Sequence, residues 1–113
     1  MRLGQNAEAE KALKEIQALG GGLEPELARL ALADLYRRSL QVDKAVEAYR
    51  GMATNPTATV PRDYALLNAA QALEDAKRWP EARAAYRQVF EEFPASVFAA
   101  EARARVEYLQ TQG

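Results

Sequence analysis

The polar side chains of this chain limit the chemistry that it can perform. Its 113 residues include no cysteine and no histidine, which removes thiol nucleophiles, histidine general bases, disulfides and the common zinc ligands together. Paired charges such as Glu91-Glu92 and Arg37-Arg38 occur without a glycine-rich phosphate loop, a dinucleotide-binding pattern or a calcium loop. The sequence therefore predicts no catalytic residue, no cofactor and no metal site.

The charge pattern also narrows the range of partners. The net charge is −1, from 15 basic and 16 acidic residues that are interleaved along the chain. Nucleic-acid-binding and membrane-surface proteins instead gather basic residues into a stripe or patch. No apolar run approaches the roughly 20 residues that span a bilayer. We expect no nucleic-acid partner and no direct membrane insertion by this segment.

Alanine content and apolar spacing predict an all-α chain. The sequence contains 24 alanines, and alanine is the best helix former. Apolar residues recur at helical spacing between glycine, proline and capping residues. Asn6, Asp43 and Ser96 are the expected N-caps of the first, third and sixth helices. Six helices are expected, over 6–19, 25–39, 43–53, 62–76, 80–93 and from 96 onward, with sequence neighbours packed antiparallel.

Two stretches of the chain repeat each other at a step of 37 residues. Matched pairs are Ala33 and Ala70, Tyr36 and Leu73, Ala45 and Ala82, Tyr49 and Tyr86, and, after one extra residue, Pro56 and Pro94. A partial third copy contains Ala9 and Leu13, with Ala9 lying 36 residues before Ala45. A period in this range predicts stacked helical units, which usually bind other proteins.

These matched residues resemble the tetratricopeptide repeat family. Leu32 and Ala33 correspond to its large–small pair, Tyr36 to the aromatic that follows, and Ala45 and Tyr49 to the second helix. The resemblance implies an all-α, tetratricopeptide-like solenoid of antiparallel helix pairs that forms a right-handed superhelix. We expect one domain over 1–113, made of a partial repeat at 4–22, repeats at 25–57 and 61–94, and a closing helix at 96–111.

The sequence departs from the family pattern at two kinds of position. Arg29 and Leu66 replace a large aromatic at the start of each first helix, and Leu40 and Lys77 replace a turn glycine.

The small residues of the motif should lie where the two helices of a unit cross, because a larger side chain would push the helices apart. These crossing pairs are Ala33 with Ala45, and Ala70 with Ala82. The aromatic residues Tyr36, Tyr49, Trp79 and Tyr86 are expected to fill the core beside the crossings. Phe90, Phe93 and Phe98 are expected to hold the closing helix in place.

In such a stack the first helices line a concave face, which we expect to bind a protein or peptide segment. Helix phase places ten residues there, with Tyr64 and Asn68 at the centre: Leu27, Leu30, Asp34, Arg37, Arg38, Tyr64, Leu67, Asn68, Gln71 and Asp75. The alternative is a face that is merely solvated or partly covered by the closing helix. A chaperone-type carboxylate clamp is not expected, because Leu30 and Asp34 stand where that clamp needs a cation and an amide.

The closing unit resembles bacterial cell-envelope members of the family. The likeness lies in residues 86–96, followed by Ala99, Ala102 and Leu109, and the block 61–67 is most similar to the periplasmic translocon-associated subunit. This likeness implies a periplasmic or membrane-tethered protein, and a cytoplasmic location stays open. Because the chain opens within a repeat, we expect it to be a fragment whose preceding part could hold an anchor or a signal.

Two functions of different classes follow from these patterns. The first is a non-catalytic protein-interaction module or scaffold that acts in a bacterial cell envelope. The alternative is a structural homo-oligomerisation domain, because a truncated first repeat would leave apolar helix surface that could pair with a second copy.

Overall fold

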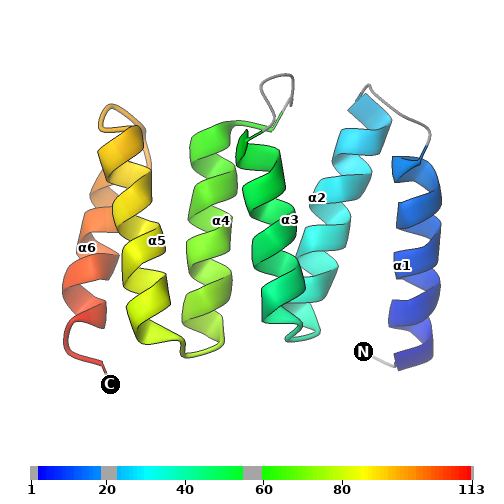
Figure 1. Cartoon of the computed structure of the whole chain (residues 1–113), viewed down its shortest axis with the longest axis horizontal. Helices are drawn as coiled ribbons and strands as arrows, with labels where there is room; N and C mark the ends of the chain where they lie inside the picture. The colour runs from blue at the N-terminus through cyan, green and yellow to red at the C-terminus, as the bar shows by residue number, and fades with distance from the viewer. Residues whose placement is uncertain (1–2, 19–22, 55–59, 113) are drawn as a thin grey trace.

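The structure is a computed structural model that describes residues 3–18, 23–54 and 60–112. Its helices are α1 (Leu3–Gln17), α2 (Leu23–Arg38), α3 (Val42–Thr54), α4 (Arg62–Asp75), α5 (Trp79–Glu92) and α6 (Ala99–Leu109). They follow one another along the array in chain order, and each packs chiefly against its sequence neighbours (Figure 1). No strand occurs in these ranges, and the prediction of an all-α chain with six helices is confirmed.

The predicted N-caps are wrong, although the helices themselves are where the apolar spacing put them. α1 begins at Leu3, so Asn6 lies inside it, and Asp43 lies in the first turn of α3. α3 begins early because the N–H of Gln41 closes a tight turn onto the carbonyl of Tyr36, at 2.8 Å, which returns the chain to helical geometry at once. Gly20, Gly21 and Gly22, a sequence signal for the end of the first helix, and Pro56 lie outside the described residues.

Ser96 has a different role from the predicted cap. α6 begins three residues later, at Ala99. The Ser96 hydroxyl donates to the carboxylate of Asp63 at 2.6 Å and accepts the N–H of Phe98 at 3.0 Å. Ser96 therefore ties the turn before α6 to the first turn of α4.

The alanines predicted at the helix crossings are fully buried. Ala33, Ala45, Ala70 and Ala82 each have 0 % of their surface exposed. A larger side chain at such an enclosed position would have to displace its neighbours, because interiors are packed without spare space. The burial predicted for these four positions is therefore observed.

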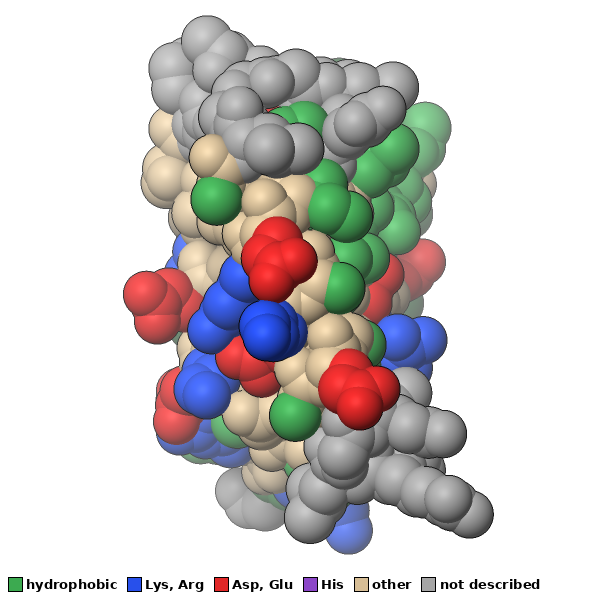
Figure 2. All heavy atoms as spheres, turned by 90° about the vertical axis from the view of Figure 1, so that its right-hand side faces the viewer, with side chains coloured by type: hydrophobic (Ala, Val, Ile, Leu, Met, Phe, Trp, Pro, Cys, Tyr) green, Lys and Arg blue, Asp and Glu red, His purple; other side chains and the backbone are tan. Residues whose placement is uncertain are grey.

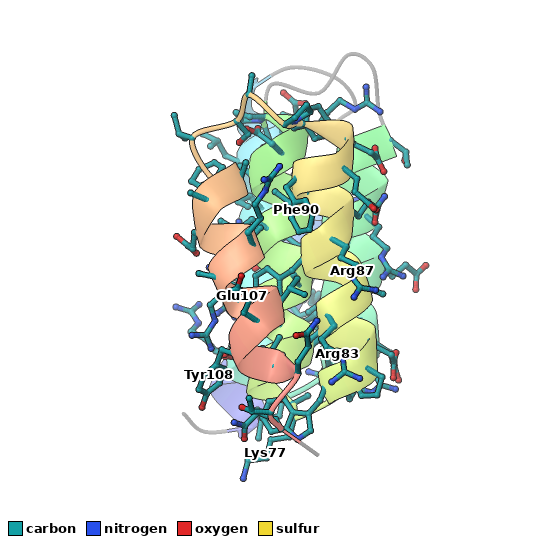
Figure 3. All side chains as sticks on the ribbon, turned by 90° about the vertical axis from the view of Figure 1, so that its left-hand side faces the viewer. Lys77, Arg83, Arg87, Phe90, Glu107 and Tyr108 are labelled. Atoms are coloured by element: carbon teal, nitrogen blue, oxygen red, sulfur yellow. The ribbon has the colours of Figure 1, made fainter. Side chains whose placement is uncertain are left out.

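The aromatic residues are in or against the core, as predicted. Tyr36, Tyr49 and Tyr86 are buried, whereas Trp79 is partly buried and packs against the core. The three phenylalanines near the last turn are also partly buried against the core. Figure 3 shows Phe90 between α5 and α6, and the guanidinium of Arg103, from α6, lies 5.0 Å from the centre of its ring.

The turns inside the two full repeats have the same strained geometry. Leu40 and Lys77 both have a φ of 61°, in the left-handed region that favours glycine. Beside them the N–H of Gln41 bonds the carbonyl of Tyr36, and the N–H of Arg78 bonds the carbonyl of Leu73. The two residues that replace the family's turn glycine therefore adopt the backbone conformation of a glycine.

Candidate interaction face across helices α2, α4 and α6

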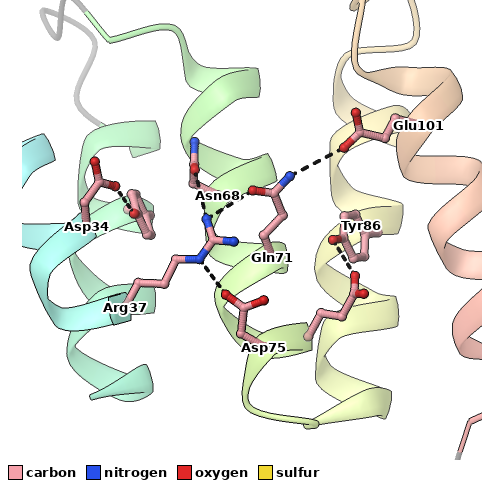
Figure 4. A network of polar contacts seen from close by, with 9 residues as sticks. Asp34, Arg37, Asn68, Gln71, Asp75, Tyr86 and Glu101 are labelled. Carbon is pink, nitrogen blue, oxygen red and sulfur yellow. Dashed lines mark hydrogen bonds and ion pairs between the residues drawn. The ribbon is translucent and has the colours of Figure 1, made fainter. Parts of the chain in front are cut away.

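A polar network connects α2, α4 and α6, and it contains most of the predicted polar site residues (Figure 4). On α2 the Arg37 guanidinium donates to Asp75 at 2.7 Å, to Gln71 at 3.1 Å and to Asn68 at 3.5 Å, all on α4. On α4 the amide of Gln71 donates to Glu101 of α6 at 3.4 Å. The contacts link the side chains of α2 to those of α4, and the side chains of α4 to those of α6.

Both ends of the Asn68 amide are used inside the protein. Its oxygen accepts from Arg37, and its nitrogen donates to the Tyr64 carbonyl at 2.8 Å. Only 6 % of the Asn68 surface is exposed. Asn68 and Gln71 are both among the residues predicted to bind a partner segment. They instead act first as bridges, because α2 and α4 bring Arg37 within reach of both.

Asp34 lies beside this network and accepts a hydrogen bond from the hydroxyl of Tyr49. Burial raises the pKa of Tyr49, and the hydrogen bond to Asp34 raises it further because the neighbouring negative charge opposes a tyrosinate. Asp34 therefore links the first helix of its unit to the second helix.

The remaining predicted residues differ in how open they are. Leu67 is buried and Leu30 is partly buried, so neither offers a free side chain. Leu27 has 52 % of its surface exposed, and Tyr64 has 37 %. The Tyr64 ring lies 6.0 Å from that of Phe98, centre to centre.

We name the open side chains around the network the α2–α4–α6 face. Two of them are largely apolar and the others are charged, with both signs present. They are Leu27, Arg38, Tyr64, Asp75 and Glu101. Of these, Glu101 was absent from the predicted site. Treating the closing helix as the first helix of a further unit would have found it, because Glu101 then lies on the face shared with α2 and α4.

Metal and membrane chemistry find no support in the described ranges. Within 3–18, 23–54 and 60–112, no group of three or more acidic, cysteine or histidine side chains could hold a metal ion. Among the helices described, none combines the length and the apolar character needed to cross a membrane.

The comparisons with known proteins give one match. The family model described as tetratricopeptide repeat matches residues 64–96, which contain most of α4, all of α5 and the turn that follows. No curated protein matches this chain, and no solved structure does. The match supports the tetratricopeptide repeat family for this chain, and the six-helix array around the matched segment has the all-α architecture expected of that family.

Proposed function

We propose that this chain is a non-catalytic interaction module that binds a segment of a partner protein on the α2–α4–α6 face. Tetratricopeptide repeats generally mediate protein–protein interactions, which supports the class of function. The observation that carries the proposal is the Arg37–Gln71–Glu101 chain of contacts, bordered by the exposed Leu27 and Tyr64.

This arrangement favours binding because the helices under the face are already held in place. A prearranged surface loses little conformational freedom when a partner docks. Tyr64 presents an apolar ring with a polar tip, and such residues often dominate binding energy. Arg38 and Asp75 offer opposite charges at the other end of the face, where they can fix the direction of an extended or helical segment.

The cellular setting is part of the proposal. The likeness of residues 86–96 to the closing unit of bacterial cell-envelope proteins favours a periplasmic or membrane-tethered scaffold similar to the translocon-associated subunit. Envelope proteins, including exported chains in transit, are then the pool from which the partner comes. Fractionation of cells that express the full-length gene product tests the compartment.

The test of the binding face uses its two exposed apolar residues. The intact chain and a Leu27→Ser, Tyr64→Ala double variant are each immobilised and exposed to a bacterial envelope extract. We expect the proteins retained by the intact chain to be lost from the double variant, with melting temperatures within a few degrees. An Arg87→Ala variant is the matched control, because Arg87 is exposed on α5, outside the α2–α4–α6 face (Figure 3). Retention of every partner at unchanged affinity by the folded double variant contradicts the proposal.

Self-association through the end formed by α1 is the second candidate, and the structure favours it less. The exposed residues of α1 include Ala12 and Ile16, with 38 % of Ile16 exposed, but Glu8, Lys11 and Glu15 stand among them. Figure 2 looks onto this end and shows charged side chains of both signs across its centre, with a run of hydrophobic ones along the upper right. Light scattering at micromolar concentration tests this candidate, because it requires a stable dimer.

A further inference from the structure

A second concave surface lies on the other side of α2 from the α2–α4–α6 face. It is a groove of about 480 Å³ between α1 and α3, with α2 as its floor. Its apolar lining consists of Leu32, Tyr36, Ala48, Met52 and Val60. On α2, Leu32 and Tyr36 are roughly opposite to Leu27 and Asp34, because residues two apart on a helix point about 200° apart. The groove is therefore separate from the face already described.

The corresponding space between α3 and α5 differs from this groove in size and in lining. It holds two smaller hollows, of about 410 Å³ and 340 Å³, and charged residues line both. Arg78, just before α5, bonds Asp43 of α3 at 2.6 Å and approaches Glu81 to 3.4 Å. The charged groups of this space are thus partly paired across it. In the groove between α1 and α3, by contrast, Leu32, Tyr36, Met52 and Val60 are buried with only their edges reaching the surface, and Ala48 is partly exposed.

A helical glycine forms part of the groove wall. Gly51 lies within α3 and lines the groove, and a Cβ built on it would have no atom within 4 Å. Glycine inside a helix costs about 1 kcal/mol relative to alanine. Packing in the described structure does not require a glycine at this position, because an alanine side chain would fit without a clash. The missing side chain leaves the α3 backbone accessible at Gly51, where an incoming chain could approach it.

The charges at the rim indicate the kind of partner. Lys14 on α1 and Lys44 on α3 are exposed on opposite walls, and Arg29 is partly exposed on the floor helix. Lys44 lies 5.5 Å from the centre of the Tyr36 ring, and Lys14 pairs with Glu10 at 2.8 Å. The exposed acid of the lining is Glu47. Because Glu10 neutralises Lys14, the positive charge of the exposed lining comes from Lys44 and Arg29, which outnumber Glu47 and complement an acidic partner.

We infer that this groove binds an acidic amphipathic helix of a partner protein, with its apolar side chains on the groove floor. On α3 the lining runs from Lys44 to Met52, which is about 12 Å at about 1.5 Å per residue. That length accommodates about two helical turns, with apolar anchors at positions i, i+3, i+4 and i+7. Acidic residues beside the anchors meet Lys44 on the α3 wall and Arg29 on the floor helix. The inference does not rest on the proposed function of the opposite face.

The experiment selects ligands without assuming their identity. A displayed library of helical peptides about four turns long, randomised in sequence, is selected on the intact chain. We expect enrichment of peptides with the i, i+3, i+4, i+7 apolar pattern and acidic flanks. Their affinities for the variants are then measured by fluorescence anisotropy with one enriched peptide as the probe.

The variants separate the groove from every other surface. Gly51→Gln places a side chain in the groove without a clash in the described structure, and should weaken the probe at least about tenfold while the protein stays folded. Lys44→Glu should weaken it several-fold at low salt and less at high salt. Ala84→Gln, at an exposed position on α5, and Tyr64→Ala should leave the affinity unchanged.

Several outcomes overturn the inference. It is wrong if no peptide is enriched, if the enriched peptides carry basic flanks, or if Gly51→Gln binds the probe as tightly as the original chain. It is also wrong if Tyr64→Ala weakens the probe, since that places the peptide on the α2–α4–α6 face. Circular dichroism of Gly51→Gln checks that a loss of binding reflects a filled groove and not an unfolded chain.

Discussion

The two full repeats bury a tyrosine at the same position but satisfy its hydroxyl from different turns of the first helix. Tyr49 donates to Asp34, which lies 15 residues before it. Tyr86 donates to Glu74, at 2.7 Å and 12 residues before it. The first unit uses an aspartate, Asp34. The second uses a glutamate, Glu74, which lies one helical turn further along the first helix of its unit. Equal apolar packing therefore does not require equal polar contacts.

Because the two units use different acidic residues, Asp34 and Glu74, they also contact their neighbouring helices differently. With the step of 37 residues, Arg37 stands at the position of Glu74. Arg37 of α2 donates to Asp75 of α4. Glu74 instead accepts hydrogen bonds from Arg105 of α6, and the distance from Arg105 Nε to Glu74 Oε1 is 3.1 Å. The adjacent acids of α4 are thus held by arginines from both sides. The two units share their apolar core but differ in the polar contacts that join them to neighbouring helices. We therefore expect substitutions in the core and in these contacts to change the free energy of unfolding by different amounts.

The largest effect should come from the shared crossings. Ala82→Leu puts three extra carbon atoms at a site with no exposed surface, and we expect it to lower the free energy of unfolding by roughly 1–3 kcal/mol. Ala45→Leu should cost a similar amount, because it is the equivalent position. Ala84→Leu, at an exposed position of the same helix, should change it by less than about 0.5 kcal/mol. Equal urea midpoints for Ala82→Leu and Ala84→Leu would show that the crossing is not tightly packed.

The buried tyrosines should make the protein unstable at high pH. Burial raises the pKa of Tyr49 and of Tyr86 above the usual 10.0, and the carboxylates Asp34 and Glu74 raise it further. Above about pH 10 the unfolded chain releases protons that the folded chain keeps, so the free energy of unfolding falls as pH rises, by up to about 1.4 kcal/mol per pH unit for each tyrosine. Urea titrations between pH 8 and 11 measure that slope. A Tyr49→Phe, Tyr86→Phe double variant should have a clearly shallower slope than the original chain, and an unchanged slope would rule out these two groups as its origin.

Removing one hydroxyl at a time at neutral pH should distinguish the two units. A hydrogen bond to a charged group contributes about 1.5–3 kcal/mol, and the loss is smaller where the charge keeps another partner. Tyr86→Phe leaves Glu74 bound to Arg105, whereas Tyr49→Phe takes from Asp34 its tyrosine donor. We therefore expect Tyr49→Phe to cost about 1.5 kcal/mol and Tyr86→Phe less than about 1 kcal/mol, measured by urea denaturation. A larger cost for Tyr86→Phe would mean that Arg105 does not compensate the acid.

The features predictable from the sequence are those that local spacing determines. The period of the apolar residues indicated six helices, which the structure confirms. The step of 37 residues singled out Ala33, Ala45, Ala70 and Ala82 as enclosed positions, and all four are buried. These features require only the helical repeat and the small size of alanine.

The polar contacts could not be predicted in the same way, because they depend on distances between helices that are far apart in sequence. Asn68 lies 31 residues from its partner Arg37, and Ser96 lies 33 residues from Asp63. Local sequence predicted Asn68 at the centre of a binding face and Ser96 as a helix cap. Both side chains are used across helices instead. A candidate binding face is therefore better identified from exposure in the fold than from helix phase.

The smallest expected effect concerns the feature in which the two units agree most closely, the strained turn. Leu40 and Lys77 both have a φ of 61°, which costs a residue with a Cβ about 1–2 kcal/mol. Glycine removes that cost but gives the unfolded chain more freedom, which returns about 0.5–1 kcal/mol. Leu40 has 75 % of its surface exposed, so its replacement loses little burial. Leu40→Gly and Lys77→Gly should each raise the free energy of unfolding by about 0.5–1 kcal/mol, and the two gains should add because the turns lie in different units. Leu40→Ala is the control: it keeps the Cβ and should bring no gain. If Leu40→Gly proved no more stable than Leu40→Ala in urea, the left-handed turn would not be a source of strain in this protein.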